Sequence, residues 1–228
     1  AAAALLLAAA APAQAAKIER VSKPGKVSYW AFVDRPAIAR AKPDPKARKV
    51  AKLTLRTPEK TDDLVLVLSR TEVDGEEWLR VSLPVRPNGT TGWVPATALG
   101  QLQPVRTWLR ISTKTFRATL IRNGKVVFRA PIGVGQPQWP TPRGQFYIRA
   151  KLKGYGKRGA FYGPLAFITS ATSEKLTDWP GGGLVGVHGT SLPGLIPGRI
   201  SHGCVRLRNA DILRLEKLMP IGTPVTIT

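Results

Sequence analysis

The chain has 228 residues, of which 43% are hydrophobic and 21% are charged, a globular composition that excludes a disordered chain. Its length suits one large domain or two modest ones. The formal net charge is +21, and it is unevenly spread: residues 17–105 carry 16 basic and 10 acidic side chains, whereas residues 106–228 carry 19 and 4. The second half therefore predicts a polyanionic environment or an anionic substrate.

The first residues, AAAALLLAAAAPAQA, have no charge, a short apolar core and the small-residue ending Ala13-Gln14-Ala15. This pattern predicts the later part of a secretory signal peptide, removed as residues 1–16. A low-complexity alanine-rich tail is the alternative. The apolar run is too short to span a bilayer, and we expect no transmembrane segment later in the chain. For an exported protein, the positive charge predicts anionic cell-wall polymers or lipid headgroups as surroundings, and we expect no nucleic-acid partner because no binding motif is found.

Residues 17–47 are proline-rich and lack strong periodicity, which predicts a linker with one strand at residues 27–33. From there, short alternating runs separated by Gly, Pro and Asn predict a small all-β unit over residues 48–103. Its expected strands are residues 52–56, 64–68, 78–83 and 92–94.

Part of this unit, GEEWLRVSLPVRPNGTTGWVPATAL at residues 75–99, resembles a bacterial SH3-like module. The resemblance lies in the WLRV strand, the following turn and the GWVPATAL ending, and it implies a small SH3-like β-barrel. Trp78 and Trp93 are then either aromatic residues of the barrel core or part of a ligand-binding surface.

Residues 105–228 are predicted to form a second, mostly β unit. Asn123-Gly124 is the strongest hairpin signal in the chain. The glycine-rich stretch at residues 151–163 predicts a mobile loop. Asn209 is expected to cap a helix that reaches about Met219. The expected strands are residues 108–111, 118–122, 126–132, 145–150, 165–168, 184–187 and 224–228.

Both histidines and the single cysteine fall within residues 188–204, in VGVHGT and SHGCVRL. A lone cysteine excludes an internal disulfide. A thiol acts as a nucleophile only as thiolate, and a neighbouring imidazole can take its proton. If the strands that carry His188 and Cys204 are neighbours, the two side chains meet at the strand ends. The amides of Gly203 and Cys204 could then stabilise an oxyanion. His202 is a second candidate base; we favour His188, with His202 shaping the site.

Two alternatives stay open at this point. The two histidines and the cysteine could bind Zn²⁺, although the spacing H-x13-H-x-C is not a familiar structural-zinc pattern and an acidic residue would have to supply the fourth ligand. The cysteine could also be a small buried hydrophobe beside two ordinary surface histidines.

The motifs HGT at residues 188–190, SHGCVRL at 201–207 and GTPVTI at 222–227 resemble the catalytic domain of the L,D-transpeptidases, the YkuD-like family. Residues 120–148, which include a TPRG turn, fit it as well. The resemblance covers residues 105–228. It implies a β-rich catalytic domain with one or two short helices, no metal and no cofactor.

The family chemistry, carried over by residue, makes Cys204 the nucleophile and His188 the general base. Cys204 would attack the carbonyl before the terminal D-Ala of a peptidoglycan tetrapeptide stem, with D-Ala leaving. The amine of a second stem would then resolve the thioester and form a 3→3 cross-link. Water as acceptor would make the protein an L,D-carboxypeptidase, and a non-catalytic wall-binding protein is the alternative from another class.

The resemblance also implies supporting and substrate-binding residues around the two catalytic ones. Arg206 either pairs with a substrate carboxylate or fixes its loop, and the basic, aromatic stretch at 151–163 either lines the donor groove or is an ordinary solvated loop. We expect a monomer that acts on peptidoglycan stem peptides in the periplasm or cell wall of a bacterium. The predicted supporting residues are Gly203, Ser201, His202 and Gly189; the predicted substrate-binding residues are Arg206, Thr190, Tyr155 and Tyr162.

Overall fold

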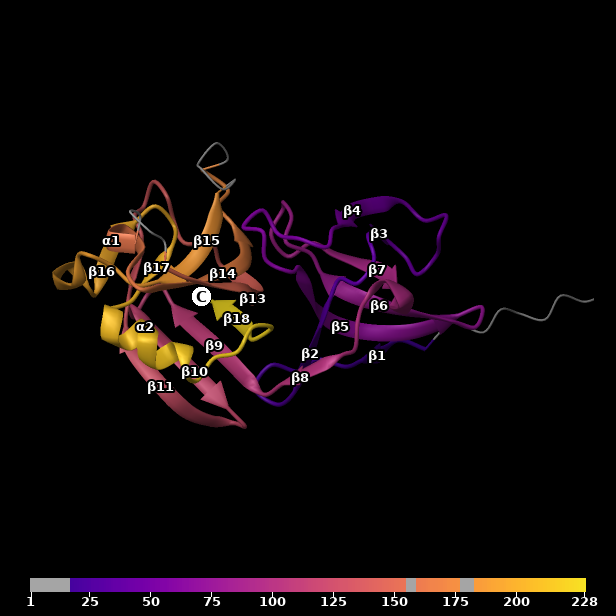
Figure 1. Cartoon of the computed structure of the whole chain (residues 1–228), viewed down its shortest axis with the longest axis horizontal. Helices are drawn as coiled ribbons and strands as arrows, with labels where there is room; N and C mark the ends of the chain where they lie inside the picture. Colours follow the sequence, from indigo (N-terminus) through magenta and orange to yellow (C-terminus); the bar gives the residue numbers. More distant parts are fainter. Residues whose placement is uncertain (1–16, 155–158, 177–182) are drawn as a thin grey trace, which may run out of the picture.

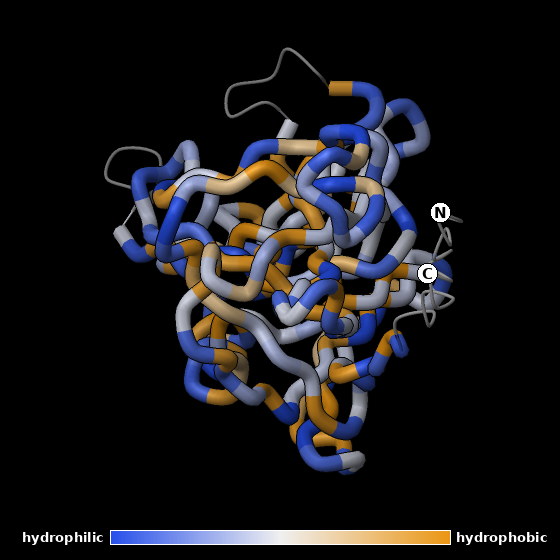
Figure 2. Tube along the Cα trace, turned by 90° about the vertical axis from the view of Figure 1, so that its right-hand side faces the viewer, coloured by the Kyte–Doolittle hydropathy of each residue, from blue (hydrophilic) through white to orange (hydrophobic). Residues whose placement is uncertain are grey.

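The computed structural model describes residues 17–154, 159–176 and 183–228. The predicted signal peptide and Tyr155 lie outside these ranges. The described chain is mainly β, as the sequence predicts, and forms two sheet-based units that lie side by side (Figure 1). Each unit has its own core of buried hydrophobic residues, and hydrophobic stretches of the chain run through the interior of the molecule (Figure 2). None of the described helices has the length and apolar character that crossing a membrane requires.

The N-terminal unit is built on one sheet, which has eight strands in the described residues. They follow the order β4-β3-β7-β6-β5-β2-β8, and β1 pairs with β5 outside this path. A short 3-10 helix, Ala96–Ala98, follows β7. The strands are β1 (Glu19–Arg20), β2 (Ser28–Phe32), β3 (Ala37–Arg40), β4 (Lys49–Leu53), β5 (Leu64–Val73), β6 (Glu76–Ser82), β7 (Thr91–Pro95) and β8 (Gln103–Val105).

Residues 17–47 are not a linker with one strand, because they contribute β1, β2 and β3 to this sheet. The strands were not predicted because their buried side chains are small. Ala31 and Ala39, for example, are fully buried in the core of the unit. Trp78 and Trp93 are buried as well, which favours their interpretation as core aromatic residues.

The C-terminal unit is built on a sheet of ten strands in the described residues, in the order β11-β10-β9-β18-β13-β14-β15-β17-β12-β16. Its last strand, β18, lies between β9 and β13. The hairpin predicted at Asn123-Gly124 is present, and both residues have a positive φ, as a two-residue turn of this kind requires. The strands are β9 (Thr107–Ser112), β10 (Arg117–Arg122), β11 (Lys125–Pro131), β12 (Gly133–Gly135), β13 (Gly144–Lys153), β14 (Leu165–Thr172), β15 (Leu184–His188), β16 (Gly198–Ser201), β17 (Val205–Arg206) and β18 (Pro224–Ile227).

Helices are short in this unit. α1 spans Gly159–Tyr162 and α2 spans Asn209–Glu216, with a 3-10 turn at Pro193–Leu195. The prediction of one loop over residues 151–163 is therefore wrong at both ends, because β13 continues to Lys153 and α1 occupies Gly159–Tyr162. The apolar face of α2 buries Ile212 and Leu215 in the core of the sheet.

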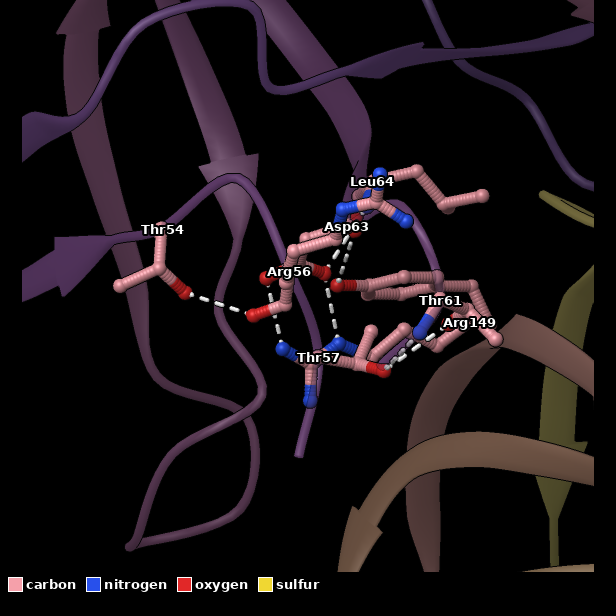
Figure 3. A network of polar contacts seen from close by, with 8 residues as sticks. Thr54, Arg56, Thr57, Thr61, Asp63, Leu64 and Arg149 are labelled. Carbon is pink, nitrogen blue, oxygen red and sulfur yellow. Dashed lines mark hydrogen bonds and ion pairs between the residues drawn. The ribbon is translucent and has the colours of Figure 1, made fainter. Parts of the chain in front are cut away.

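The two units meet through a small buried junction. Leu64 and Leu66 of β5 pack against Tyr147 of β13, and the Tyr147 hydroxyl donates to the Leu64 carbonyl at 3.2 Å. Beside it, the Arg149 guanidinium donates to both carboxylate oxygens of Asp63, at 2.7 and 2.6 Å (Figure 3). Both of these charged side chains are buried, so each supplies the partner that the other needs.

Candidate active site

The sheet order brings the histidine and cysteine motifs together. β15 ends at His188, and β17 follows Cys204 directly. The two strands pair in parallel, with His188 opposite Arg206, and the Leu207 amide donates to the His188 carbonyl at 2.8 Å. The neighbouring strands on which the predicted meeting of the two side chains depends are therefore present, although fifteen residues, including the strand β16, separate His188 from Cys204 along the chain.

Cys204 and His188 line one cleft of about 400 Å³. Its walls come from α1, from the end of β14 and the start of β15, and from the loop that carries the cysteine. Of the predicted site residues, this cleft brings together six. The lining residues are Phe161, Tyr162, Ser173, Leu176, Gly183, Leu184, His188, Ser201, His202, Cys204 and Arg206.

The Cys204 thiol is held against the first residues of β15. The Gly186 amide donates to Sγ at 3.4 Å, and Sγ lies 4.0 Å from the Leu184 carbonyl oxygen. Burial raises the pKa of the Cys204 thiol, while the Gly186 amide and the positive charge of Arg206 act to lower it. The resting group is therefore a neutral thiol that needs a base at the moment of attack.

The His188 ring is almost fully buried and its Nδ1 lies 2.6 Å from the Gly189 carbonyl oxygen. The ring also meets the Tyr162 ring edge to face, at 4.9 Å between centroids. Burial lowers the pKa of His188 to about 4, and the charge of Arg206 acts in the same direction, whereas backbone hydrogen bonds with Gly189 and Tyr162 oppose the shift. At neutral pH the imidazole is therefore uncharged and able to accept a proton.

Arg206 is the buried cation of the cleft. Only 5% of its surface is exposed, and its guanidinium lies 4.7 Å above the Phe161 ring. Within the described residues its Nε has no hydrogen-bond partner and no carboxylate forms an ion pair with it. Burial lowers the pKa of Arg206, against the influence of the Cys204 thiol. A buried guanidinium nitrogen without a hydrogen bond costs free energy, which a bound anion would recover.

The loop that carries Cys204 is fixed by two hydroxyl groups. The Ser201 hydroxyl donates to the Cys204 carbonyl at 2.5 Å and accepts from the Gly203 amide at 3.1 Å. The Thr141 hydroxyl donates to the Gly203 carbonyl at 2.9 Å and accepts from the Gly135 amide at 2.8 Å. Gly203 has a φ of +116°, which only glycine adopts readily.

These contacts bear on the expected role of Gly203. Its amide donates to the Ser201 hydroxyl, so an oxyanion would have to compete with Ser201 for this amide. Gly203 is a supporting residue of the site, and the sequence did not reveal Thr141, whose only signal was the TPRG turn.

Thr190 and Asn209 correct two further expectations. Thr190 is buried, its hydroxyl accepts from the Leu192 amide at 3.1 Å, and it does not line the cleft, so it is not placed to bind substrate. The Asn209 side chain does not cap α2, whose N-cap is Arg208; instead Asn209 Oδ1 accepts from the Thr190 amide at 2.9 Å. Asn209 also packs against Gly189, which leaves no room there for a larger residue.

His202 also lines the cleft. Its ring packs against Trp139 at 4.3 Å between centroids, and it is half-buried. This placement fits a residue that shapes the site. Among the described residues, no three His, Cys, Asp or Glu side chains gather as a metal ion would require.

The geometry agrees with the comparisons to known proteins. Residues 106–227 match the L,D-transpeptidase catalytic domain, YkuD, and the chain therefore belongs to this family. It is 33% identical over 124 residues to the putative L,D-transpeptidase YkuD of Bacillus subtilis, covering 54% of this chain and 66% of the relative. It is 28% identical to the putative L,D-transpeptidase YqjB of the same organism, covering 52% of this chain and 69% of the relative.

The chain thus spans about two thirds of the length of these curated relatives. Among solved structures, a mutant of the Enterococcus faecium L,D-transpeptidase is 25% identical, with a TM-score of 0.42, covering 54% of this chain and 50% of that one. An L,D-transpeptidase from Mycobacterium tuberculosis is 16% identical, with a TM-score of 0.45, covering 67% of this chain and 90% of that one.

Proposed function

We propose that the protein is a peptidoglycan L,D-transpeptidase that uses Cys204 as its nucleophile and His188 as its general base. The observation that supports this most is the sharing of one cleft by the only cysteine of the chain and a buried, neutral histidine on the neighbouring strand. Membership of the family supplies the substrate class. A leader-like start and a strongly basic catalytic half support action on an anionic wall outside the cytoplasm.

The first half of the reaction is acylation. The Cys204 sulfur attacks the carbonyl carbon before the terminal D-Ala of the donor stem while its proton passes to His188. Backbone carbonyls of Gly189 and Tyr162 stabilise the imidazolium once it forms, because they raise the pKa that burial lowers. When the tetrahedral intermediate collapses, the bond to the D-Ala nitrogen breaks, His188 returns the proton to that nitrogen, and a thioester remains on Cys204.

The second half transfers the acyl group to an amine of another stem. The amine attacks the thioester carbonyl, loses a proton to His188, and displaces the sulfur, which is reprotonated. Arg206 is the donor-binding residue in this scheme: its buried guanidinium holds a carboxylate of the stem. Phe161 and Tyr162 form the apolar and aromatic wall beside it.

The test is intact-protein mass spectrometry after incubation with a carbapenem, or with a tetrapeptide donor ending in D-Ala. Because Cys204 is the only cysteine in the sequence, one adduct per chain on the wild type reports that thiol alone. We expect this adduct on the wild type and none on Cys204→Ser. A folded wild-type protein that forms no adduct with either compound would overturn the proposal. Adding an amine acceptor to the peptide reaction should convert the acyl-enzyme to a cross-linked product rather than to a free tripeptide.

A further inference from the structure

The residues that line the cleft all belong to the C-terminal unit, but the N-terminal unit contacts one of its walls. The turn between β6 and β7 of the N-terminal unit reaches the end of β14, next to the active site. There the Asn88 side chain makes a paired contact with Thr172: its Nδ2 donates to the Thr172 carbonyl at 2.7 Å, and its Oδ1 accepts from the Thr172 amide at 3.0 Å. The Asn88 amide thus does for Thr172 what a neighbouring β-strand would do.

Arg86 continues this contact by one residue. Its Nε and Nη2 both donate to the Ser173 carbonyl, at 3.2 and 3.0 Å. The same guanidinium lies so close to Gly183 that a Cβ there would be 2.9 Å from Nη2. The turn itself is held by Thr90, whose hydroxyl donates to the Pro87 carbonyl at 2.6 Å. The side chains of Arg86 and Asn88 therefore make hydrogen bonds with the backbone of two consecutive residues, Thr172 and Ser173.

The residues held in this way form a wall of the cleft. Ser173 lines it, and the Ser173 amide donates to the Gly183 carbonyl at 2.7 Å. The Ser173 hydroxyl accepts from the amide of Leu176, another lining residue, at 3.1 Å. Thr172 is paired with Leu184 across β14 and β15, and Leu184 is the residue whose carbonyl faces the Cys204 sulfur. The path from the N-terminal unit to the nucleophile is thus continuous and short.

We propose that Arg86 and Asn88 are positioning residues of the active site, through which the N-terminal unit completes the donor-binding wall of the cleft. This rests on the proposed function for the identity of the donor. It is distinct from simple docking of the units, because the junction around Asp63 and Arg149 is buried and fully paired without either residue.

The experiment compares four variants with the wild type. Asn88→Leu and Arg86→Met remove the two contacts. Arg80→Met is the matched control, because Arg80 is an exposed arginine of the same unit whose guanidinium donates to the Thr91 hydroxyl within that unit. Asp63→Asn weakens the other junction. For each protein, kcat and KM are measured with the tetrapeptide donor, the rate of Cys204 alkylation is measured with iodoacetamide, and the thermal midpoint is recorded.

Asn88→Leu and Arg86→Met should raise the donor KM about ten-fold with kcat largely retained, because a displaced wall weakens binding more than chemistry. They should also raise the alkylation rate about ten-fold at a temperature where the protein is fully folded, because the relaxed wall admits solvent and reagent. Arg80→Met should match the wild type. Asp63→Asn should lower the thermal midpoint most and leave KM and alkylation within two-fold.

Two results would overturn the inference: KM and alkylation in Asn88→Leu within two-fold of the wild type, or changes in Asp63→Asn as large as those in Asn88→Leu. Alkylation does not depend on acyl transfer. If the wild type fails to turn over the donor while alkylation still separates the variants as described, the positioning role stands and only the proposed function fails.

Discussion

The protein buries two arginines in different ways. Arg149, at the junction of the two units, donates to both oxygens of Asp63, and this pair is shielded from solvent. Arg206, in the cleft, is equally buried but stacks on Phe161 and leaves its Nε without a partner in the described structure. Arg149 thus has its carboxylate partner inside the protein, whereas we expect a bound carboxylate to supply the partner that the Arg206 Nε lacks. We therefore expect the loss of Arg149 to lower mainly the stability of the protein, and the loss of Arg206 to lower mainly its activity.

The largest effect that follows concerns His188, which lies in the same cleft as Arg206 and is kept uncharged by its burial. His188→Ala should lower the acylation rate by about 10³-fold or more, because the neutral Cys204 thiol then has no base. The thermal midpoint should change little. The measurement is single-turnover acylation by the tetrapeptide donor, followed by mass spectrometry. A variant that retains acylation within ten-fold of the wild type would place the base elsewhere, with His202 as the first candidate.

The second prediction compares the effects of Arg149 and Arg206 on the free energy of unfolding. Arg149→Met should lower the free energy of unfolding by about 3–5 kcal/mol, because it leaves Asp63 buried without a partner. Arg206→Met should change it by about 1 kcal/mol or less, and in the stabilising direction, because it removes an unpaired charge from the interior. Urea unfolding of both variants gives the comparison. Equal losses from the two substitutions would show that Arg206 is paired in solution.

Donor kinetics complete this test, since activity should rank the two variants in the opposite order. Arg206→Met should lower kcat/KM for the donor by about 10²-fold, the scale expected when a charge-assisted contact to substrate is lost. Arg149→Met, assayed below its thermal midpoint, should stay close to the wild type.

The third prediction is a pH dependence of stability. The pKa of His188 is lowered to about 4 in the folded protein, from about 6.5 in the unfolded chain. Between these values the unfolded chain binds a proton that the folded protein does not. The His188 contribution is therefore fully present above pH 6.5 and is lost as the pH falls toward 4, by about 3 kcal/mol. Urea unfolding at pH 7 and pH 4 should show this loss in the wild type and a smaller one in His188→Gln.

Much of the C-terminal unit could be predicted from the sequence because the patterns that define its elements are local. The hairpin at Asn123-Gly124, the short strands and the motifs around His188 and Cys204 are each defined by a few adjacent residues. The pairing of β15 with β17 could be inferred only as a condition, because nothing in the sequence says which strands lie side by side. Thr141 and Asn209 were missed for the same reason, since each acts on a loop far from it along the chain.

The N-terminal half was predicted less well. Residues 17–47 look like a linker because prolines interrupt them and their buried side chains are small, yet they supply three strands. Contacts between the units, such as Asn88 with Thr172, cannot be read from either segment, because an exposed turn residue and its distant partner carry no shared pattern. The SH3-like barrel and the signal peptide remain predictions.

The position of β18 bears on how the protein reaches its folded state. This strand runs parallel to β9, from which more than a hundred residues separate it, and antiparallel to β13. Completion of the sheet must therefore wait for a contact of very high sequence separation, and such contacts slow folding because loop closure costs entropy before pairing offsets it. A product truncated before Pro224 would expose two open edges at the centre of the sheet, where another chain can add as a strand. Proteolysis or premature termination near residue 224 should thus yield aggregation rather than a smaller active enzyme.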